Sequence, residues 1–434
     1  MSLPPGRLPV IHQPYPESYY AATRNPDPGY PALAGEIEAD VCVCGGGFTG
    51  IATALSLAER GYSVVVLEQN RIGWGASGRN GGQVIGGFSG EALMAKRLGQ
   101  VAADLIWDIG WRGNTLIAER VEKYAIDCDF KYGYMDVALK PRHMHDFEEY
   151  HAELLRRGFG DDVRLVQRDG MRSVIGSEAY IGGLINRRSG HLHPLNLCLG
   201  EARAAAGLGV RLFEGSQVLA IEHGAQPVVR TSNGRVKAAS VVLAGNAYQQ
   251  LETRRLPGQV FPAGSFIIAT EPLSEDLARE INPLDMAFCD PNYVLDYFRL
   301  STDRRLLFGG RCNYSGRVPA SIRGSIEPRM HKIFPQLRSA RIDYEWGGSI
   351  GIVVNRVPVI GRLRANVYCA LGYSGHGVNM THAAGEILAE AIGGTMEKLD
   401  LFERIGHPRI PFGQAVSSQL VALGMLYYRL RDTL

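Results

Sequence analysis

The sequence feature that most restricts the fold is a glycine turn between an apolar run and a helical pattern. Residues 39–44 are short and mostly apolar, which is typical of a buried parallel strand. The run leads into Gly45–Gly50 (GGGFTG), and residues 51–60 then follow a helical period that Gly61 ends. Residues 63–68 are a second apolar run, so strand, helix and strand together take roughly 30 residues, the size of one βαβ unit.

The glycines of this turn have the spacing of a dinucleotide-binding turn, Gly-x-Gly-x-x-Gly. Gly45 permits the tight turn, Gly47 lets the backbone approach a pyrophosphate, and Gly50 lets the helix pack close to the sheet. The helix begins near Phe48 and Thr49, where free N–H groups and the positive dipole end suit phosphates.

An acidic residue stands where the same motif places its ribose contact. Glu68 ends the second strand about 20 residues after the turn, so its carboxylate can accept the ribose hydroxyls. An acid at this position argues against a 2′-phosphate and hence against NADP. A turn of packing glycines alone would leave Glu68 unexplained. We also expect Gln69, Val218 and Gly245 to contact the nucleotide.

Composition fits a globular enzyme with two domains. The chain has 434 residues, 45% hydrophobic and 21% charged, with 46 basic and 44 acidic residues and a net charge of +2. No basic run with interleaved aromatics indicates a nucleic-acid partner. No apolar run approaches the ~20 residues of a membrane span, and residues 1–16 lack the pattern of a secretory signal.

The cysteines indicate a reducing compartment and no metal site. They are scattered as Cys42, Cys44, Cys128, Cys198, Cys289, Cys312 and Cys369. Cys42 and Cys44 lie within the first apolar strand, which favours a place in the core over metal binding. We therefore expect a soluble, cytoplasmic protein.

The order of elements predicts an α/β chain, α+β overall, in which a nucleotide domain of separate segments encloses a substrate domain. Residues 251–345 alternate apolar and polar positions, as in a mostly antiparallel sheet. Near the end, strand 367–371 is followed by a glycine-rich turn and a helix over 380–392. The predicted division is an irregular surface arm (1–34), a Rossmann-like nucleotide domain (35–95, 161–250 and 346–400), a substrate domain (96–160 and 251–345), and a helical tail (401–434) with an amphipathic helix over 413–432.

Two further glycine-rich segments have the character of cofactor loops. The first carries many N–H groups beside an arginine and an asparagine, which suits an anionic, hydrogen-bonding cofactor; a flexible surface loop is the alternative. The second is another helix N-terminus at the carboxyl edge of a sheet, suited to the pyrimidine end of an isoalloxazine, unless its histidine is only a structural turn residue. The residues expected to bind are Gly75, Ala76, Ser77, Arg79, Asn80, Gly81, Gly82 and Gln83 in the first, and Gly372, Tyr373, Ser374, Gly375, His376, Gly377 and Val378 in the second.

Together these blocks resemble the D-amino-acid-oxidase-like FAD oxidoreductases, whose relatives include sarcosine, glycine and dimethylglycine oxidases. The chain looks most similar to the γ-glutamylputrescine oxidoreductase branch. The likeness also rests on residues 18–22, 191–194, 270–273, 296–299, 306–310, 358–361 and 381–382, and thus spans almost the whole chain.

The resemblance implies FAD and oxidation of a C–N bond. A hydride passes from the carbon beside a neutral amine to flavin N5, and the imine is hydrolysed to an aldehyde and ammonia. The expected substrate is γ-glutamylputrescine or a related polyamine derivative. The alternatives are a D-amino-acid or N-methyl-amino-acid oxidase or dehydrogenase, and a protein that uses FAD only structurally.

Departures from the family pattern refine the substrate. Sarcosine-oxidase relatives place a basic residue three positions after the motif histidine, to hold a substrate carboxylate; here that residue is Asn379, which favours amines. Arg299 remains a candidate carboxylate anchor or a plain sheet arginine. Tyr297 and Trp346 are candidate walls of the amine pocket or core residues. With His376, these residues form the expected catalytic group.

The same comparison bears on the flavin linkage and on reoxidation. Covalent relatives carry a cysteine before the Pro-x-Ile-Gly block, and residues 351–356 contain none. The loop 77–79 also lacks a histidine, so we expect non-covalent FAD. No lysine lies between Lys237 and Lys332, so the family's oxygen-activating lysine is not expected, and O2 or another acceptor reoxidises the flavin.

Overall fold

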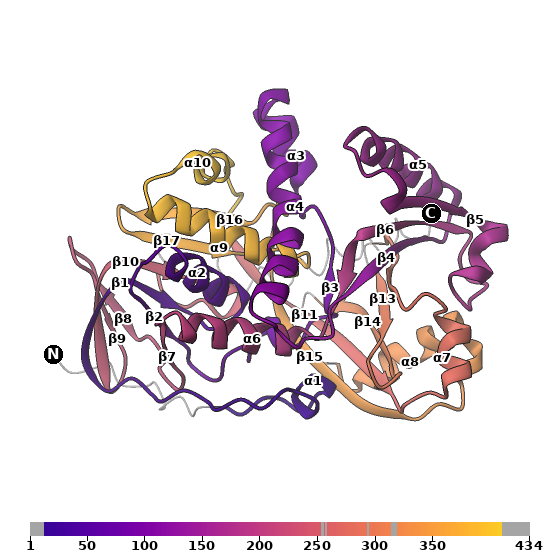
Figure 1. The fold of residues 1–434 in the computed structure, drawn as a ribbon, viewed down its shortest axis with the longest axis horizontal. Coiled ribbons are helices and arrows are strands. Elements are labelled where there is room, and N and C mark those ends of the chain that lie inside the picture. Colours follow the sequence, from indigo (N-terminus) through magenta and orange to yellow (C-terminus); the bar gives the residue numbers. More distant parts are fainter. Residues whose placement is uncertain (1–12, 253–255, 257, 293–294, 314–318, 410–434) are drawn as a thin grey trace.

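The computed structural model describes residues 13–252, 256, 258–292, 295–313 and 319–409, which form two sheets with helices around them (Figure 1). The first sheet has the order β16 (Val359–Arg364), β17 (Val367–Leu371), β10 (Gly234–Leu243), β1 (Gly35–Cys44), β2 (Val64–Leu67) and β7 (Arg211–Phe213). In addition, β9 (Val228–Arg230) pairs with β10, and β8 (Ala220–Glu222) pairs with β9. The second has the order β15 (Ile342–Val353), β11 (Val260–Thr270), β14 (Leu306–Asn313), β13 (Asp296–Leu300), β12 (Ala287–Cys289), β4 (Lys131–Ala138), β6 (Gly182–His191) and β3 (Gln83–Val84), with β5 (Val163–Gln167) beside β6.

The centre of the first sheet is the predicted βαβ unit. β1 pairs in parallel with β2 and with β10, and α2 (Phe48–Ala58) connects β1 to β2. Val41 and Val43 enter one hydrophobic cluster, whereas Cys42 and Cys44 enter the cluster on the opposite face. Because both faces are covered, the strand is apolar throughout, and the expected core position of the two cysteines is confirmed.

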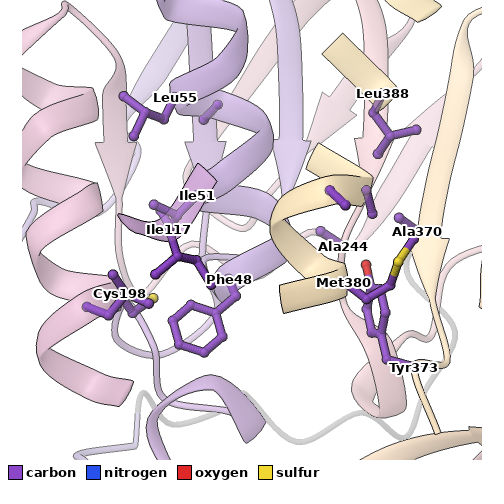
Figure 2. Packing of buried hydrophobic residues seen from close by; sticks show 14 of the residues in the cluster. Phe48, Ile51, Leu55, Ile117, Cys198, Ala244, Ala370, Tyr373, Met380 and Leu388 are labelled. Carbon is purple, nitrogen blue, oxygen red and sulfur yellow. The ribbon is translucent and has the colours of Figure 1, made fainter. Parts of the chain in front are cut away.

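Three helices, α2, α6 (Pro194–Gly207) and α9 (Val378–Ile392), pack together in one of these clusters. Ile51 of α2 lies beside Ile117 of α4 (Gln100–Lys123) in Figure 2, and Leu55 of α2, Cys198 of α6, and Met380 and Leu388 of α9 belong to the same cluster. This packing fixes the starts of α2 and α9, which are the two predicted cofactor turns.

The second sheet is antiparallel apart from the β12–β4 pair, as expected for the middle of the chain. Phe288, Phe298 and Phe308 stack across adjacent strands with ring centroids 5.1 and 5.5 Å apart. Helices α5 (Pro141–Arg156), α7 (Glu275–Ile281) and α8 (Ile322–Ile333) lie on this side of the molecule (Figure 1). The alternating pattern did not reveal α7 and α8.

Strand pairing corrects the predicted domain boundaries in three places. β3, β5 and β6 belong to the second sheet, although residues 35–95 and 161–250 were expected in the nucleotide domain. β15 also belongs there up to Val353. Helix α10 (Glu397–Glu403) crosses the predicted start of the tail at residue 401, and the helix expected over 413–432 lies outside the described residues.

Most residues of the arm between 13 and 34 are exposed or half-buried, as expected of a surface arm, but residues 18–20 anchor it in the interior. Ser18 caps the short helix α1 (Tyr19–Ala22), and Tyr20 is completely buried. Its hydroxyl accepts a hydrogen bond from Arg299 at 3.3 Å, and its ring meets Trp346 edge-on. In the part of the chain that the structure describes, no helix is both long and apolar enough to cross a bilayer.

Candidate functional site

The turn between β1 and α2 presents bare backbone because neighbouring atoms leave no room for side chains. Gly45 has φ +122°, and a Cβ there would lie 2.8 Å from the Ala244 carbonyl oxygen. A Cβ at Gly50 would lie 1.9 Å from the Gly45 carbonyl oxygen. A Cβ at Gly47 would meet Ser77 Oγ at 2.8 Å, and the same Oγ accepts the first N–H of α2 from Phe48. The turn and the Ser77 loop therefore form one cradle.

Glu68 is fixed at the edge of this cradle. Its Oε2 accepts the Gly46 N–H at 2.7 Å, and its Oε1 accepts the Asn70 N–H at 2.8 Å. Burial raises the pKa of Glu68, and the charge of Glu214 raises it further by a smaller amount, whereas these hydrogen bonds lower it. A carboxylate held in this way at the end of β2 is placed to accept hydroxyl hydrogen bonds.

A first cavity joins all three predicted cofactor segments. Of the predicted residues, its lining includes Gly45, Gly47, Phe48, Thr49, Glu68, Gln69, Gly75, Ala76, Ser77, Asn80, Val218, Gly245, Tyr373, Ser374, Gly375, Gly377 and Val378. Gly50, Gly82 and Gly372 lie outside the lining; at each of them a Cβ would come within 2.4 Å of a neighbouring atom, which points to packing roles.

Sequence reasoning missed several lining residues of the first cavity. They include Gln13, Asn70, Trp74, Gln217, Asn246, Tyr248, Gln249, Ile350, Gly351 and Thr381. Asn246 could have been found, because it follows the carboxyl end of β10, where ligands of such sheets bind. Its Oδ1 accepts the Gly372 N–H at 2.9 Å. Gln13, from the arm, carries no comparable signal.

The turn before α9 faces the turn before α2. Thr49 and Tyr373 share a hydroxyl–hydroxyl hydrogen bond of 2.8 Å between the two turns. Ser374 has φ +54°, a left-handed backbone that its N–H stabilises by donating to the Gly351 carbonyl at 2.9 Å. α9 has no side-chain cap, so its first N–H groups lie open beside Gly377, in the wall of the cavity.

A second cavity adjoins the first. The two share the lining residues Ala76, Asn80, Ile350, Ser374, Gly375, Gly377 and Val378. The predicted residues Arg79, Gly81, Gln83, Tyr297 and His376 line only the second cavity, together with Glu91, Trp111, Tyr134, Asp136, Tyr150, Ser265, Cys289 and Arg356, among others. A flat ring bound at the boundary would therefore be accessible from both cavities.

Arg79 lies near this boundary as a half-buried cation. Its Nε donates to the Trp74 carbonyl at 2.8 Å, and its guanidinium lies 4.2 Å from the centre of the Trp74 ring. Its Nη2 is buried without a hydrogen-bond partner among the described residues. Desolvation lowers the pKa of Arg79, and no carboxylate compensates. Such a donor suits an anionic or carbonyl group of a ligand.

Tyr297 and His376 are the two residues of the expected catalytic group that reach the second cavity. The Tyr297 ring fills the space above Gly81, and its hydroxyl lies 3.2 Å from Ser265 Oγ. His376 Nε2 donates to the Ile85 carbonyl at 3.1 Å. Burial lowers the pKa of His376, so the imidazole is neutral at physiological pH.

Arg299 and Trp346 lie behind the wall rather than in it. Arg299 is 2% exposed, and its guanidinium donates to the carbonyls of Gly81 and Leu300 at 2.9 and 3.1 Å. Trp346 Nε1 donates to the Arg79 carbonyl at 3.0 Å. Neither residue lines either cavity, so the expected direct contacts with a substrate are not seen.

Asn379 is also a supporting residue. Its side-chain amide donates to the carbonyls of Gly87 and Gly110 at 2.8 and 3.0 Å, which joins α9 to α4 and to the 85–90 segment. It is 1% exposed and lines neither cavity. The position therefore holds a wall in place and does not face a substrate directly.

Two acidic residues of the second cavity were not predicted. Burial raises the pKa of Asp136 to about 6 and that of Glu91 to about 7. Asp136 stands within the apolar strand β4, and an acid in such a strand was the one available signal. Glu91 is the first residue of α3 (Glu91–Leu98), where an acid is ordinary, so its position in the cavity could not be inferred.

Comparison with known proteins agrees with this site. Residues 40–391 match the model of the family described as FAD dependent oxidoreductase. The chain is 42% identical to the γ-glutamylputrescine oxidoreductase of Escherichia coli, over 96% of this chain and 98% of that protein. It is 41% identical to the "Probable oxidoreductase OrdL" of Haemophilus influenzae, over 98% and 99%. The crystal structure of glycine oxidase from Bacillus cereus has the same fold, with a TM-score of 0.68 at 21% identity, over 86% of this chain and 99% of that one. The chain is thus a member of the FAD dependent oxidoreductase family.

Proposed function

We propose that this enzyme oxidises the primary amine of γ-glutamylputrescine or of a closely related polyamine derivative. The observation that carries the proposal is the second cavity, which adjoins the first and is lined by acidic as well as basic side chains. A substrate with both ammonium and carboxylate groups would be matched there. The name of the Escherichia coli relative supports the same substrate.

The first cavity fits FAD. The glycine cradle at Gly45 and Gly47 leaves room for a pyrophosphate against bare backbone, and Glu68 is held at the strand end for the ribose. The unpartnered Nη2 of Arg79 and the uncapped start of α9 would serve the polar end of the flavin ring. FAD supplies the acceptor for the hydride that leaves the carbon beside nitrogen.

The cavity residues orient the amine and favour its neutral form. Tyr297 and Ser265 present two hydroxyls 3.2 Å apart, which can hold the amine nitrogen by hydrogen bonds. The neutral imidazole of His376 adds no charge beside the reacting nitrogen. A cavity from which water is removed disfavours an ammonium ion relative to the uncharged amine. Only the uncharged amine has the lone pair that assists hydride loss.

Arg299 and Trp346 act on this chemistry as positioning residues. Each fixes a backbone carbonyl of the loop that separates the two cavities, at Gly81 and at Arg79 respectively. Arg356 lines the second cavity and is the arginine that we assign to a substrate carboxylate.

We propose non-covalent FAD and a cytoplasmic location. Among the described residues, the lining of the first cavity contains one cysteine, Cys44, at the end of β1 beside the phosphate cradle, and no histidine. Burial raises the pKa of Cys289 in the second cavity, which keeps its thiol protonated and unreactive. After precipitation with acid, yellow supernatant and a colourless pellet are expected; flavin left in the pellet would refute non-covalent binding.

Arg79 is the cation that we place beside the flavin during reoxidation by O2 or by another acceptor, because no lysine of the described residues lines either cavity. Replacement Arg79→Met should slow reoxidation of the reduced enzyme, measured by stopped flow with O2 and with an artificial acceptor. An unchanged rate with both acceptors would refute this role.

The substrate proposal is tested by anaerobic reduction of the holoenzyme. γ-Glutamylputrescine, putrescine, spermidine, sarcosine and D-alanine are mixed separately with the protein, and loss of the visible flavin absorbance is followed. γ-Glutamylputrescine should bleach the flavin fastest. Bleaching by D-alanine or sarcosine alone would establish an amino-acid oxidase instead, and bleaching by none would favour a structural use of FAD.

A matched pair of variants tests the orientation of the amine. Tyr297→Phe removes a hydroxyl from the second cavity, whereas Tyr132→Phe removes one from a residue that is 60% exposed. Only Tyr297→Phe should slow flavin reduction, by roughly 5- to 10-fold for one hydrogen bond. Equal rates in both variants would remove Tyr297 from the mechanism.

A further inference from the structure

One part of the second cavity is built from two carboxylates and several aromatic rings. Glu91 begins α3, and Asp136 lies on β4. Tyr150 of α5 lies within electrostatic reach of both, because the two carboxylates raise the pKa of its phenol in addition to the effect of burial. All three line the second cavity and none lines the first.

Within the part of the chain that the structure describes, no lysine or arginine forms an ion pair with either carboxylate. Asp136 Oδ1 accepts the Tyr134 hydroxyl at 2.7 Å, and Glu91 Oε2 accepts the Phe88 N–H at 3.2 Å. Arg157 acts on Glu91 from a distance, but its guanidinium is engaged by Glu153 at 2.8 Å and by Asp104. Burial disfavours the ionised form of both acids and raises their pKa values, whereas a bound cation would favour the ionised form.

Aromatic rings and an unused donor complete this part of the cavity. Trp111, Tyr134, Tyr150 and Phe88 line the second cavity, and aromatic rings attract cations. Trp111 is held against Gly86, where a Cβ would come within 2.3 Å of its ring. Its Nε1–H is buried and has no acceptor among the described residues. Among the described residues, neither an acceptor for this N–H nor a cation paired with the two acids is seen.

We infer that Asp136 and Glu91 bind a second ammonium group of the substrate, at the end remote from the carbon that is oxidised. This inference rests on the proposed function and names its specificity site. In γ-glutamylputrescine the second ammonium is the α-amino group of the glutamyl part, and its neighbouring carboxylate and amide oxygens are acceptors for Trp111 Nε1–H. A monoamine has no group for this site.

The test compares two substrates that differ only in this ammonium. γ-Glutamylputrescine carries it, and N-glutarylputrescine keeps the carboxylate, the amide and the reacting amine but lacks it. Flavin reduction by each is measured anaerobically for the wild type, Asp136→Asn and Glu91→Gln. Glu148→Gln is the control, because Glu148 is an exposed acid on α5 that lines neither cavity. Bound flavin and thermal unfolding are recorded to confirm that each variant folds.

The wild type should prefer γ-glutamylputrescine by about 10- to 100-fold in kcat/KM, the value of one charge-assisted hydrogen-bonded pair. The preference should fall toward one in Asp136→Asn and in Glu91→Gln, and it should persist in Glu148→Gln. If kcat/KM falls by the same factor for both substrates in Asp136→Asn and Glu91→Gln, the carboxylates act on the reacting amine or on folding, and the inference is overturned.

A binding measurement separates this inference from the proposed function. If no amine reduces the flavin, the proposed reaction is wrong. Calorimetric titration of the oxidised holoenzyme with putrescine and with butylamine still measures whether Asp136 and Glu91 bind a second ammonium group. Tighter binding of the dication, lost in Asp136→Asn together with Glu91→Gln, would support a site for a second ammonium. Equal affinities of the wild type for the two amines would overturn it.

Discussion

The buried carboxylate of Glu201 holds together the helices that carry both cofactor turns. Glu201 on α6 and Arg120 on α4 are 0% and 1% exposed, and their side chains meet at 3.3 Å. On α9, His382 Nε2 lies 3.0 Å from Glu201 Oε2, and Nδ1 lies 2.6 Å from the Val378 carbonyl oxygen. Glu201 therefore compensates the buried Arg120 cation and also contacts the His382 ring, which links α6 to α4 and to α9.

Replacement Glu201→Leu should therefore lower the free energy of unfolding by about 3–5 kcal/mol, the cost of breaking a buried pair. The matched control is Glu386→Leu. It removes a pair between α9 and α4 that Glu386 forms with Arg112 at 2.9 Å, and the two side chains are 13% and 34% exposed. Glu386→Leu should lower the free energy of unfolding by less than about 1 kcal/mol. With an unfolding entropy of roughly 2.1 cal/mol/K per residue, these values correspond to falls in Tm of about 3–5 °C and about 1 °C or less.

The assay is thermal unfolding of flavin-free protein by circular dichroism, because bound FAD would add its own stabilisation. The double variant Arg120→Met/Glu201→Leu should recover part of the loss, since it removes one buried cation with the buried anion. Equal falls in Tm for Glu201→Leu and Glu386→Leu, or no recovery in the double variant, would refute the reasoning.

The sign of the pH dependence gives a second check on the same variant. Desolvation opposes ionisation of Glu201, but His382 and Arg120 outweigh it and lower its pKa below the ordinary 4.5. A carboxylate with a lowered folded-state pKa contributes stability above pH 4.5 and loses it as the pH falls below that value. The difference in Tm between the wild type and Glu201→Leu should therefore be largest at pH 7 and should decrease below pH 4.5.

Three other substitutions have defined outcomes. Gly50→Ala places a Cβ 1.9 Å from the Gly45 carbonyl oxygen and should abolish flavin retention, whereas Gly207→Ala, where a Cβ meets nothing within 4 Å, should retain flavin as measured by absorbance. Arg299→Met should raise KM and lower flavin occupancy together, because the loop carbonyl that it holds borders the second cavity; a change in KM for carboxylate-bearing substrates alone would instead indicate direct contact. Burial raises the pKa of Asp136 from 3.8 to about 6. The protonated side chain therefore stabilises the folded state below pH 3.8, and this contribution is lost as the pH rises through 6. Asp136→Asn should raise Tm more at pH 8 than at pH 4, and the reverse order would contradict the raised pKa.

Local chemistry explains what could be predicted. A pyrophosphate needs backbone without side chains after a strand, and only glycine supplies it at a φ of +122°, so Gly45 and its spacing to Glu68 indicated the site directly. Strand β17 matches its predicted bounds, because a buried parallel strand is a continuous apolar run. The acids of the second cavity had no such signal. Glu91 and Asp136 come from a helix start and a strand that only the tertiary fold brings to one cavity.

Asn379 illustrates why a missing residue is weaker evidence than a present one. The lack of a basic side chain there argued for amines over amino acids, yet Asn379 donates to two backbone carbonyls behind the wall and does not line the cavity. Its identity is therefore accounted for by the support of Gly87 and does not by itself restrict the ligand. Under the inference drawn above, Asp136 and Glu91 restrict the ligand instead, because their carboxyl groups line the cavity. A small α-amino acid would place its single ammonium at the flavin and leave both acids uncompensated, whereas a longer molecule with a second ammonium would satisfy them. The preference for a polyamine derivative thus depends on these two carboxylates rather than on position 379.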